Sequence, residues 1–102
     1  MREIKIGRIY KHFKDKYYVI LDIVNDCEDV NNKIVIYKAL YGDYKVWARN
    51  YGDFISEIDR VKYPEFIQKY RFEELKDINE LKDYINNYNN ELNIKINNLT
   101  DF

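Results

Sequence analysis

The sequence has too few cysteines, histidines and hydroxyl side chains to build the common catalytic or metal sites. Its 102 residues include one cysteine, Cys27, and one histidine, His12, which excludes an internal disulfide and a cysteine-based zinc site. Ser56 and Thr100 are the single serine and the single threonine, so no hydroxyl nucleophile has an evident base and orienting group beside it. We therefore expect a protein that is not an enzyme and that uses no metal or cofactor.

The chain also lacks a long apolar run and an excess of either charge. No segment approaches the ~20 apolar residues of a membrane-spanning helix, and the N-terminus lacks the apolar segment of a signal peptide. The net charge is −1, although residues 2–16 carry six basic side chains against two acidic ones. We expect a cytoplasmic protein with no membrane partner, and we do not expect nucleic acid to be its main partner.

Residues 6–60 predict a mainly β domain. Runs rich in β-branched and aromatic residues at 17–24, 33–41 and 44–49 are typical of strands, and shorter strands are expected at 8–10 and 55–58. A polar loop at 25–32 and a turn at Gly42-Asp43 separate the long strands. Short strands at this spacing favour a small five-stranded, mostly antiparallel barrel.

The C-terminal part has a different pattern. Apolar residues recur at three- and four-residue spacing, which predicts an amphipathic helix and makes the whole chain α+β; they are Leu75, Ile78, Leu81, Ile85 and Tyr88. The tail beyond is rich in Asn, and residues 92–96 either form a late edge strand or belong to a disordered end. We divide the chain into a barrel domain at 1–73 and a helix with an Asn-rich tail at 74–102. The helix either packs on its own barrel or pairs with a copy of itself, and we expect a homo-oligomer.

Several motifs resemble one known family. They are Tyr10-Lys11-His12-Phe13-Lys14, Tyr17-Tyr18, Ile36-Tyr37-Lys38-Ala39-Leu40-Tyr41-Gly42-Asp43 and Trp47-Ala48-Arg49. In this order and spacing they resemble the small bacterial family catalogued as domain of unknown function 1653, over roughly residues 6 to 73. The resemblance implies an SH3-like β-barrel and no particular reaction. The chain departs from the family at 25–32, where a His-Ser-Glu-Thr-type turn is common, at Asn50, where Pro is common, and at Asp53, where Met is usual.

Aromatic and basic residues of the strands form the candidate ligand site. Trp47 and Arg49 lie two apart on one strand, so their side chains project to the same side. An aromatic plate beside a guanidinium fork suits a planar ring that carries a phosphate. The full candidate set is His12, Lys14, Tyr37, Tyr41, Trp47 and Arg49.

Each member of this set also has a structural interpretation. Trp47 could close the barrel while Arg49 forms a surface ion pair, and His12 could serve only to bond the backbone. Tyr37 and Tyr41 could be outer-face aromatics that the C-terminal helix covers. The sequence leaves both interpretations open.

Three functions are compatible with these residues. The first is non-catalytic binding of a small anionic, nucleotide-like ligand, in its sharpest form the sequestration of a nucleotide immune signal by a phage protein. The second is a protein-interaction module that holds a peptide in an aromatic groove. The third is weak RNA binding by stacked aromatics, against which the pI of about 5.8 argues.

Overall fold

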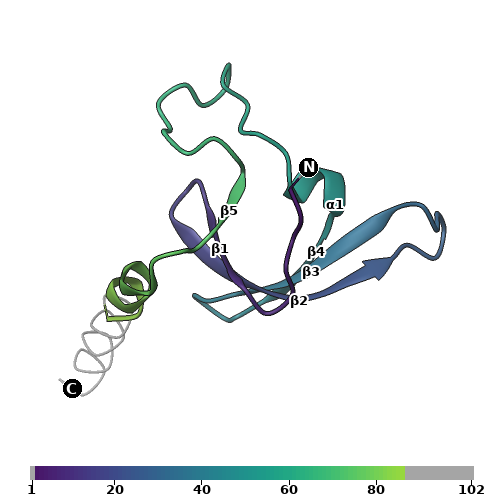
Figure 1. Ribbon diagram of the computed structural model, residues 1–102, viewed down its shortest axis with the longest axis horizontal. Coiled ribbons are helices and arrows are strands. Elements are labelled where there is room, and N and C mark those ends of the chain that lie inside the picture. The colour runs from purple at the N-terminus through teal and green to yellow at the C-terminus, as the bar shows by residue number, and fades with distance from the viewer. Residues whose placement is uncertain (1, 87–102) are drawn as a thin grey trace, which may run out of the picture.

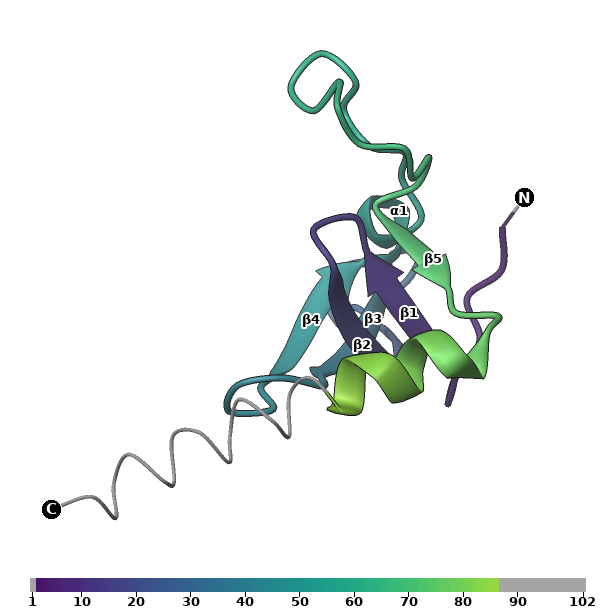
Figure 2. The ribbon, with the colours of Figure 1, turned by 90° about the vertical axis from the view of Figure 1, so that its left-hand side faces the viewer.

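Within residues 2–86, five antiparallel strands form one sheet, which confirms the mainly β prediction. The computed structural model describes residues 2–86 (Figures 1 and 2). The elements in chain order are β1 (Ile9–His12), β2 (Lys16–Asn25), β3 (Lys33–Ala39), β4 (Val46–Asn50), the short helix α1 (Tyr51–Phe54) and β5 (Phe72–Glu74). The strand order across the sheet is β4-β3-β2-β1-β5, so the first four strands form a meander and β5 joins beside β1.

Tight turns connect the hairpins. Between β1 and β2 the chain reverses through Asp15, whose φ of 62° lies in the left-handed region that Asp tolerates. The predicted turn at Gly42-Asp43 joins β3 to β4, with φ of 59° at Gly42. Tyr44 in the same turn has φ of 55°, which is unfavourable for a bulky side chain.

The position predicted for the fifth strand was wrong. After β4 the chain turns into α1, because the Asn50 side chain caps the helix by accepting a hydrogen bond of 2.9 Å from the Gly52 amide. Residues 55–58 contribute only an isolated bridge, from Glu57 to Tyr70. The fifth strand is instead β5, which pairs with β1 and straddles the boundary that we placed between residues 73 and 74.

Closure of the sheet into an SH3-like barrel is not confirmed. β4 and β5 are the two edges of the sheet, and no hydrogen-bonded pairing joins them among residues 2–86. Side chains bridge the two edges instead. Phe54, from the helix after β4, stacks face to face on Phe72 of β5, with ring centroids 4.1 Å apart and planes 6° apart.

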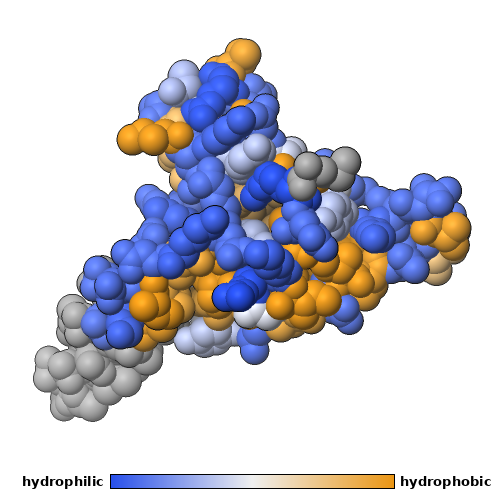
Figure 3. Space-filling model, viewed as in Figure 1, coloured by the Kyte–Doolittle hydropathy of each residue, from blue (hydrophilic) through white to orange (hydrophobic). Residues whose placement is uncertain are grey.

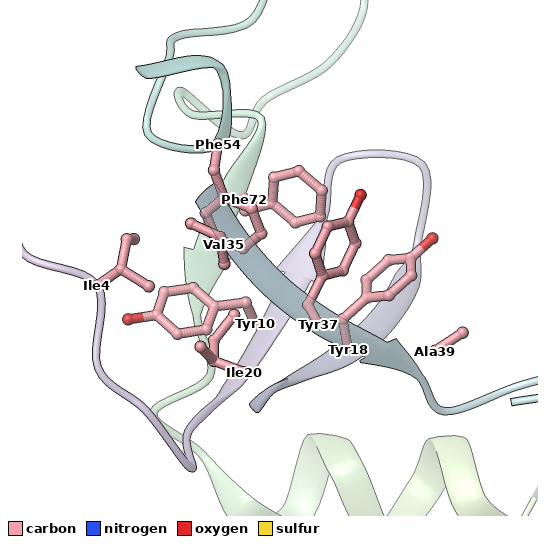
Figure 4. Packing of buried hydrophobic residues seen from close by; sticks show 9 residues of the cluster. All are labelled: Ile4, Tyr10, Tyr18, Ile20, Val35, Tyr37, Ala39, Phe54 and Phe72. Carbon is pink, nitrogen blue, oxygen red and sulfur yellow. The ribbon is translucent and has the colours of Figure 1, made fainter. Parts of the chain in front are cut away.

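Aromatic rings dominate the core on the concave side of the sheet. Along β3 every second residue is buried, which brings Val35, Tyr37 and Ala39 inward. The buried tyrosines keep their hydroxyls paired: Tyr10 accepts from the Lys5 amide at 3.1 Å. The core cluster consists of Ile4, Tyr10, Tyr18, Ile20, Val35, Tyr37, Ala39, Phe54 and Phe72 (Figure 4).

The predicted C-terminal helix starts later than its apolar spacing indicates. The Leu75 amide donates to the Ile9 carbonyl at 2.8 Å, so this residue extends the pairing of β5, and residues 78–86 are helical. None of the helices in residues 2–86 has the length and apolar character needed to cross a membrane. The predicted helix position Tyr88 and the Asn-rich tail lie outside the described residues.

The helix docks on the outer side of β1 and β2 through polar and aromatic contacts (Figure 2). One Glu80 carboxylate oxygen accepts from the Tyr17 hydroxyl at 2.7 Å and from the Lys11 ammonium at 2.9 Å. These two hydrogen bonds, the Tyr17 bond first, lower the pKa of Glu80. The Tyr84 ring packs on the Tyr17 ring, with centroids 4.5 Å apart.

We predict that Phe72→Ala lowers the free energy of unfolding by about 3–5 kcal/mol, because it deletes a fully buried ring that joins the two sheet edges. Phe66→Ala, which deletes the same ring from a half-buried loop position, is the matched control and should lose less than half as much. Urea unfolding followed by circular dichroism measures both. Equal losses would contradict the bridging role of Phe72.

Candidate functional site

A hollow of ≈350 Å³ lies between the β1–β2 turn and the loop that leads from α1 to β5. This loop arches above the β1–β2 hairpin in Figure 1. Residues from four separate segments line the hollow: His12, Phe13, Lys14, Arg49, Ile58, Asp59, Lys62, Tyr63 and Arg71. Because they are far apart in sequence, the hollow exists only in the folded sheet.

Backbone hydrogen bonds hold the walls of the hollow together. The Phe13 amide donates to the Arg71 carbonyl at 3.1 Å, which fixes the β1–β2 turn beside the start of β5. The Arg71 amide donates in turn to the Ser56 carbonyl at 2.9 Å. Arg71 is thereby held directly beside the segment that follows α1.

The walls of the hollow are basic. Four cationic side chains, Lys14, Arg49, Lys62 and Arg71, face one carboxylate, that of Asp59. The Asp59 carboxylate is engaged within its own loop. One of its oxygens accepts hydrogen bonds from the backbone amides two and three residues later, at 3.0 and 3.2 Å. Among residues 2–86, none of the four cations forms an ion pair. An anion entering the hollow therefore meets four cations and a single carboxylate, which is an excess of positive charge.

Both arginines are anchored through Nε. Arg49 donates from Nε to the Tyr37 hydroxyl at 3.2 Å, and its guanidinium lies 5.7 Å from the centre of the Phe72 ring. Arg71 donates from Nε to the Ser56 hydroxyl at 3.3 Å. Neither bond uses the two terminal nitrogens, which together can pair end-on with two phosphate or carboxylate oxygens.

His12 is a neutral hydrogen-bond donor on the wall of the hollow. Burial first, and then the charges of Arg49, Arg71 and Lys14, lower its pKa from 6.5 to about 4. Its Nδ1 accepts from the Lys14 amide at 3.1 Å, so the proton of the neutral ring sits on Nε2. The backbone role and the pocket role that we considered for His12 are therefore compatible with each other.

Aromatic rings flank these charges. The Lys14 and Lys62 ammonium groups lie 5.1 and 5.4 Å from the centre of the Tyr63 ring. Desolvation acts to raise the pKa of Tyr63, but hydrogen bonds from these two lysines outweigh it, and the pKa is lowered. The Phe13 ring packs against Tyr63 with centroids 5.0 Å apart.

The structure brings together only part of the predicted site. His12, Lys14 and Arg49 share the basic hollow, and Tyr37 lies in the core beneath it with its hydroxyl bonded to Arg49. Trp47 and Tyr41 line a different hollow of ≈260 Å³ beside the β3–β4 turn. Although they share a side of β4, Trp47 lies toward that turn while Arg49 lies toward α1 and reaches Phe72.

Neither Arg49 nor Tyr37 has the purely structural role considered for it above. Arg49 forms no ion pair within residues 2–86, and the helix does not cover Tyr37, which is a core residue. The tyrosine that contacts the helix is Tyr17. Tyr41 pairs its hydroxyl with that of Tyr18 at 2.7 Å.

Arg71, Lys62 and Tyr63 were missing from the predicted set. The available signal was the pair of motifs Lys62-Tyr63-Pro64 and Gln68-Lys69-Tyr70-Arg71-Phe72, which lie outside every predicted strand. Their place beside His12 depends on the pairing of β5 with β1.

A larger hollow of ≈430 Å³ near the N-terminus has balanced charges. Lys5 pairs with Glu74 at 3.8 Å, and the Arg2 guanidinium donates to the backbone carbonyls of Ile55 and Phe72. Among residues 2–86, no group of three acidic, histidine or cysteine side chains could hold a metal ion. The basic hollow is therefore the stronger candidate for a ligand site.

Residues 8–74 match the family described as "protein of unknown function (DUF1653)", which covers more than half of the chain. The chain belongs to this family. Neither the search of curated proteins nor that of solved structures gave a match. The DUF1653 match ends at the last residue of β5, so it includes all five strands and every wall of the basic hollow.

The DUF1653 domain should lose stability in acid through His12. Its pKa of about 4 in the folded protein lies below the value of 6.5 for an unperturbed ring, so the unfolded chain binds the proton first. Stability is therefore full above about pH 6.5 and falls as the pH drops toward 4. We expect a loss of about 1–2 kcal/mol for this half-buried ring once solvent screening is included.

The measurement is urea unfolding of the wild type and His12→Asn between pH 4 and pH 7. The Asn side chain keeps an acceptor for the Lys14 amide but does not titrate. The carboxylates are common to both proteins, so the difference between the two profiles isolates the histidine. Parallel profiles would show that the folded state does not perturb His12.

Proposed function

We propose that this protein binds a small anionic ligand of the nucleotide type and does not transform it. The observation that carries the proposal is the convergence of four cations without ion-pair partners in residues 2–86 on one hollow, together with a neutral histidine donor. The volume of the basic hollow, ≈350 Å³, is near the lower end of the about 300–1,000 Å³ that is typical of small-molecule sites.

The chemistry of the walls suits a phosphate group. Arg49 and Arg71 present the terminal nitrogens of two guanidinium forks, which bind phosphate oxygens through charge-assisted hydrogen bonds. His12 adds a donor from Nε2 without adding a charge that would depend on pH near neutrality. Tyr63 and Phe13 supply ring surface beside the cations for the planar part of the ligand.

The same geometry supports binding rather than catalysis. A general base must accept a proton near neutral pH, but His12 has a pKa of about 4 and its Nδ1 already accepts a hydrogen bond. The serine that anchors Arg71, Ser56, donates its own proton to the Asp53 carbonyl at 2.6 Å and has no base beside it in the hollow. Sequestration of a nucleotide immune signal in the cytoplasm is the specific form of the proposal, since it requires tight binding and no turnover.

A second candidate function has one observation in its favour. Trp47 is 47% exposed and forms, with Tyr41 and Lys45, the walls of the hollow beside the β3–β4 turn. Exposed aromatic walls of this kind hold extended peptides in interaction modules. Trp47→Ala should abolish peptide binding there but leave nucleotide binding in the basic hollow unchanged.

The binding proposal predicts a specific need for guanidinium forks. Arg49→Lys and Arg71→Lys keep the charge but lose the two-point pairing by the terminal nitrogens, so each should weaken binding of adenosine 5′-monophosphate about ten- to a hundredfold. Arg8→Lys changes an exposed arginine outside the hollow and is the matched control. Isothermal titration calorimetry at constant ionic strength measures the three affinities. Wild-type affinity in both hollow variants would refute the assignment.

A second measurement tests where the anion lies. A phosphate beside His12 stabilises the protonated ring, so saturating inorganic phosphate should raise the pKa of this histidine above about 4. Because the chain has one histidine, NMR titration of its ring protons reports on this site alone. Sodium chloride at the same ionic strength is the control for screening. An identical titration in phosphate and in chloride would place the anion elsewhere.

A further inference from the structure

The C-terminal helix leaves apolar residues uncovered although it is docked on the sheet. Its docked side consists of Glu80 and Tyr84, which contact Lys11 and Tyr17. Ile78 and Ile85 are 58% and 45% exposed. At about 100° per residue, these two isoleucines lie roughly a third of a turn around the helix from the docked side.

The two exposed isoleucines and the half-buried Leu81 have the spacing of a coiled coil. Ile78, Leu81 and Ile85 stand at heptad positions a, d and a, and we call these three residues the seam. The printed sequence keeps the same spacing at Tyr88 and Leu92, which lie outside the described residues. A seam of two positions in seven is narrower than the apolar face of a helix that packs only on its own domain.

The seam borders further apolar surface of the domain. Ile78 and Leu81 line a groove of ≈250 Å³ together with Leu75 and Ile9. Leu81 is half-buried, whereas the two isoleucines protrude beyond it. Figure 3 shows apolar surface over this part of the molecule, where the helix meets the sheet. A second helix packed along the seam would cover both the seam and this groove.

We propose that the seam pairs with the seam of a second copy of this chain, in parallel orientation. The charges beside the seam decide the occupant and its direction. Lys82 stands at position e, and Asp77, the residue just before the first helical residue, falls at position g of the same spacing; neither forms an ion pair within residues 2–86. In a parallel pair, position g of one helix faces position e five residues later in the other, so the two-fold axis creates two Asp77–Lys82 pairs. Antiparallel pairing sets e against e and g against g, which opposes like charges.

The apolar half of the proposal is tested by sedimentation of the full chain. The wild type should have twice the chain mass, and Ile85→Asp should reduce it to the mass of one chain. Val61→Asp, at a position 94% exposed on the loop after α1, is the matched control and should leave the mass doubled. Because Ile85 is exposed within one chain, circular dichroism of the sheet should be unchanged. A wild type of single-chain mass, or a doubled mass in Ile85→Asp, would overturn the proposal.

The proposed Asp77–Lys82 pairing is tested with one substitution that introduces repulsion and a second that removes it. Lys82→Glu places a carboxylate opposite Asp77 of the other copy and should weaken the dimer at least tenfold at low salt. Adding Asp77→Asn removes this repulsion and keeps an acceptor for the Asn79 amide, which Asp77 binds at 2.9 Å at the start of the helix. The double variant should therefore recover the dimer. An unchanged dimer in Lys82→Glu alone would overturn the parallel register.

Discussion

The stack of Phe54 on Phe72 is the contact on which the other features of this domain depend. It joins a four-residue helix to a three-residue strand, neither of which is long enough to persist alone. Tyr18 and Tyr37 meet the edge of the Phe72 ring at 5.7 and 5.6 Å, so the pair is the centre of the aromatic core. The Arg49 guanidinium on β4, which lies 5.7 Å from the centre of the Phe72 ring on β5, adds a second side-chain contact between the two edges.

The same ring supports the candidate site from below. The His12 ring meets Phe72 at 4.9 Å, and the Arg49 guanidinium lies above Phe72 at 5.7 Å. Both groups are therefore positioned by the core residue that holds the sheet edges together. The Phe72 ring therefore contributes to the burial that lowers the pKa of His12, and it helps the Tyr37 hydroxyl to position the Arg49 guanidinium.

The long strands could be predicted because their local sequence is consistent with the sheet. β2, β3 and β4 carry dense β-branched and aromatic runs, and Gly42 marks the turn between the last two. β5 could not be predicted, because Phe72-Glu73-Glu74 has no strand pattern and is extended only through its pairing with β1. α1 was not predicted, because residues 51–54 break the strand pattern without showing a helical one, and the helix depends on capping by the Asn50 side chain.

The types of residue in the site could be predicted from the sequence, but their arrangement in space could not. His12, Lys14 and Arg49 were identified from their chemistry and share one hollow. Alternation along β4 correctly places Trp47 and Arg49 on one side, but it does not give the position of the hollows along that side. Arg71 reaches the hollow through a hydrogen bond between residues 13 and 71, and no periodicity in a single sequence records such a contact.

The pairing of β1 with β5 has a consequence for how the domain forms. Strands β1 to β4 are hairpin neighbours and can associate as soon as they are synthesised. The pairing of β1 with β5, in which Tyr10 lies opposite Glu74, requires a segment more than sixty residues further along the chain. Closing that span carries a large entropic cost before any contact offsets it, so the addition of β5 is expected to be the slow step of folding. Until then β1 is an unpaired edge with its core face open to solvent. The time for which this edge is exposed during folding should therefore depend on how fast β5 is added.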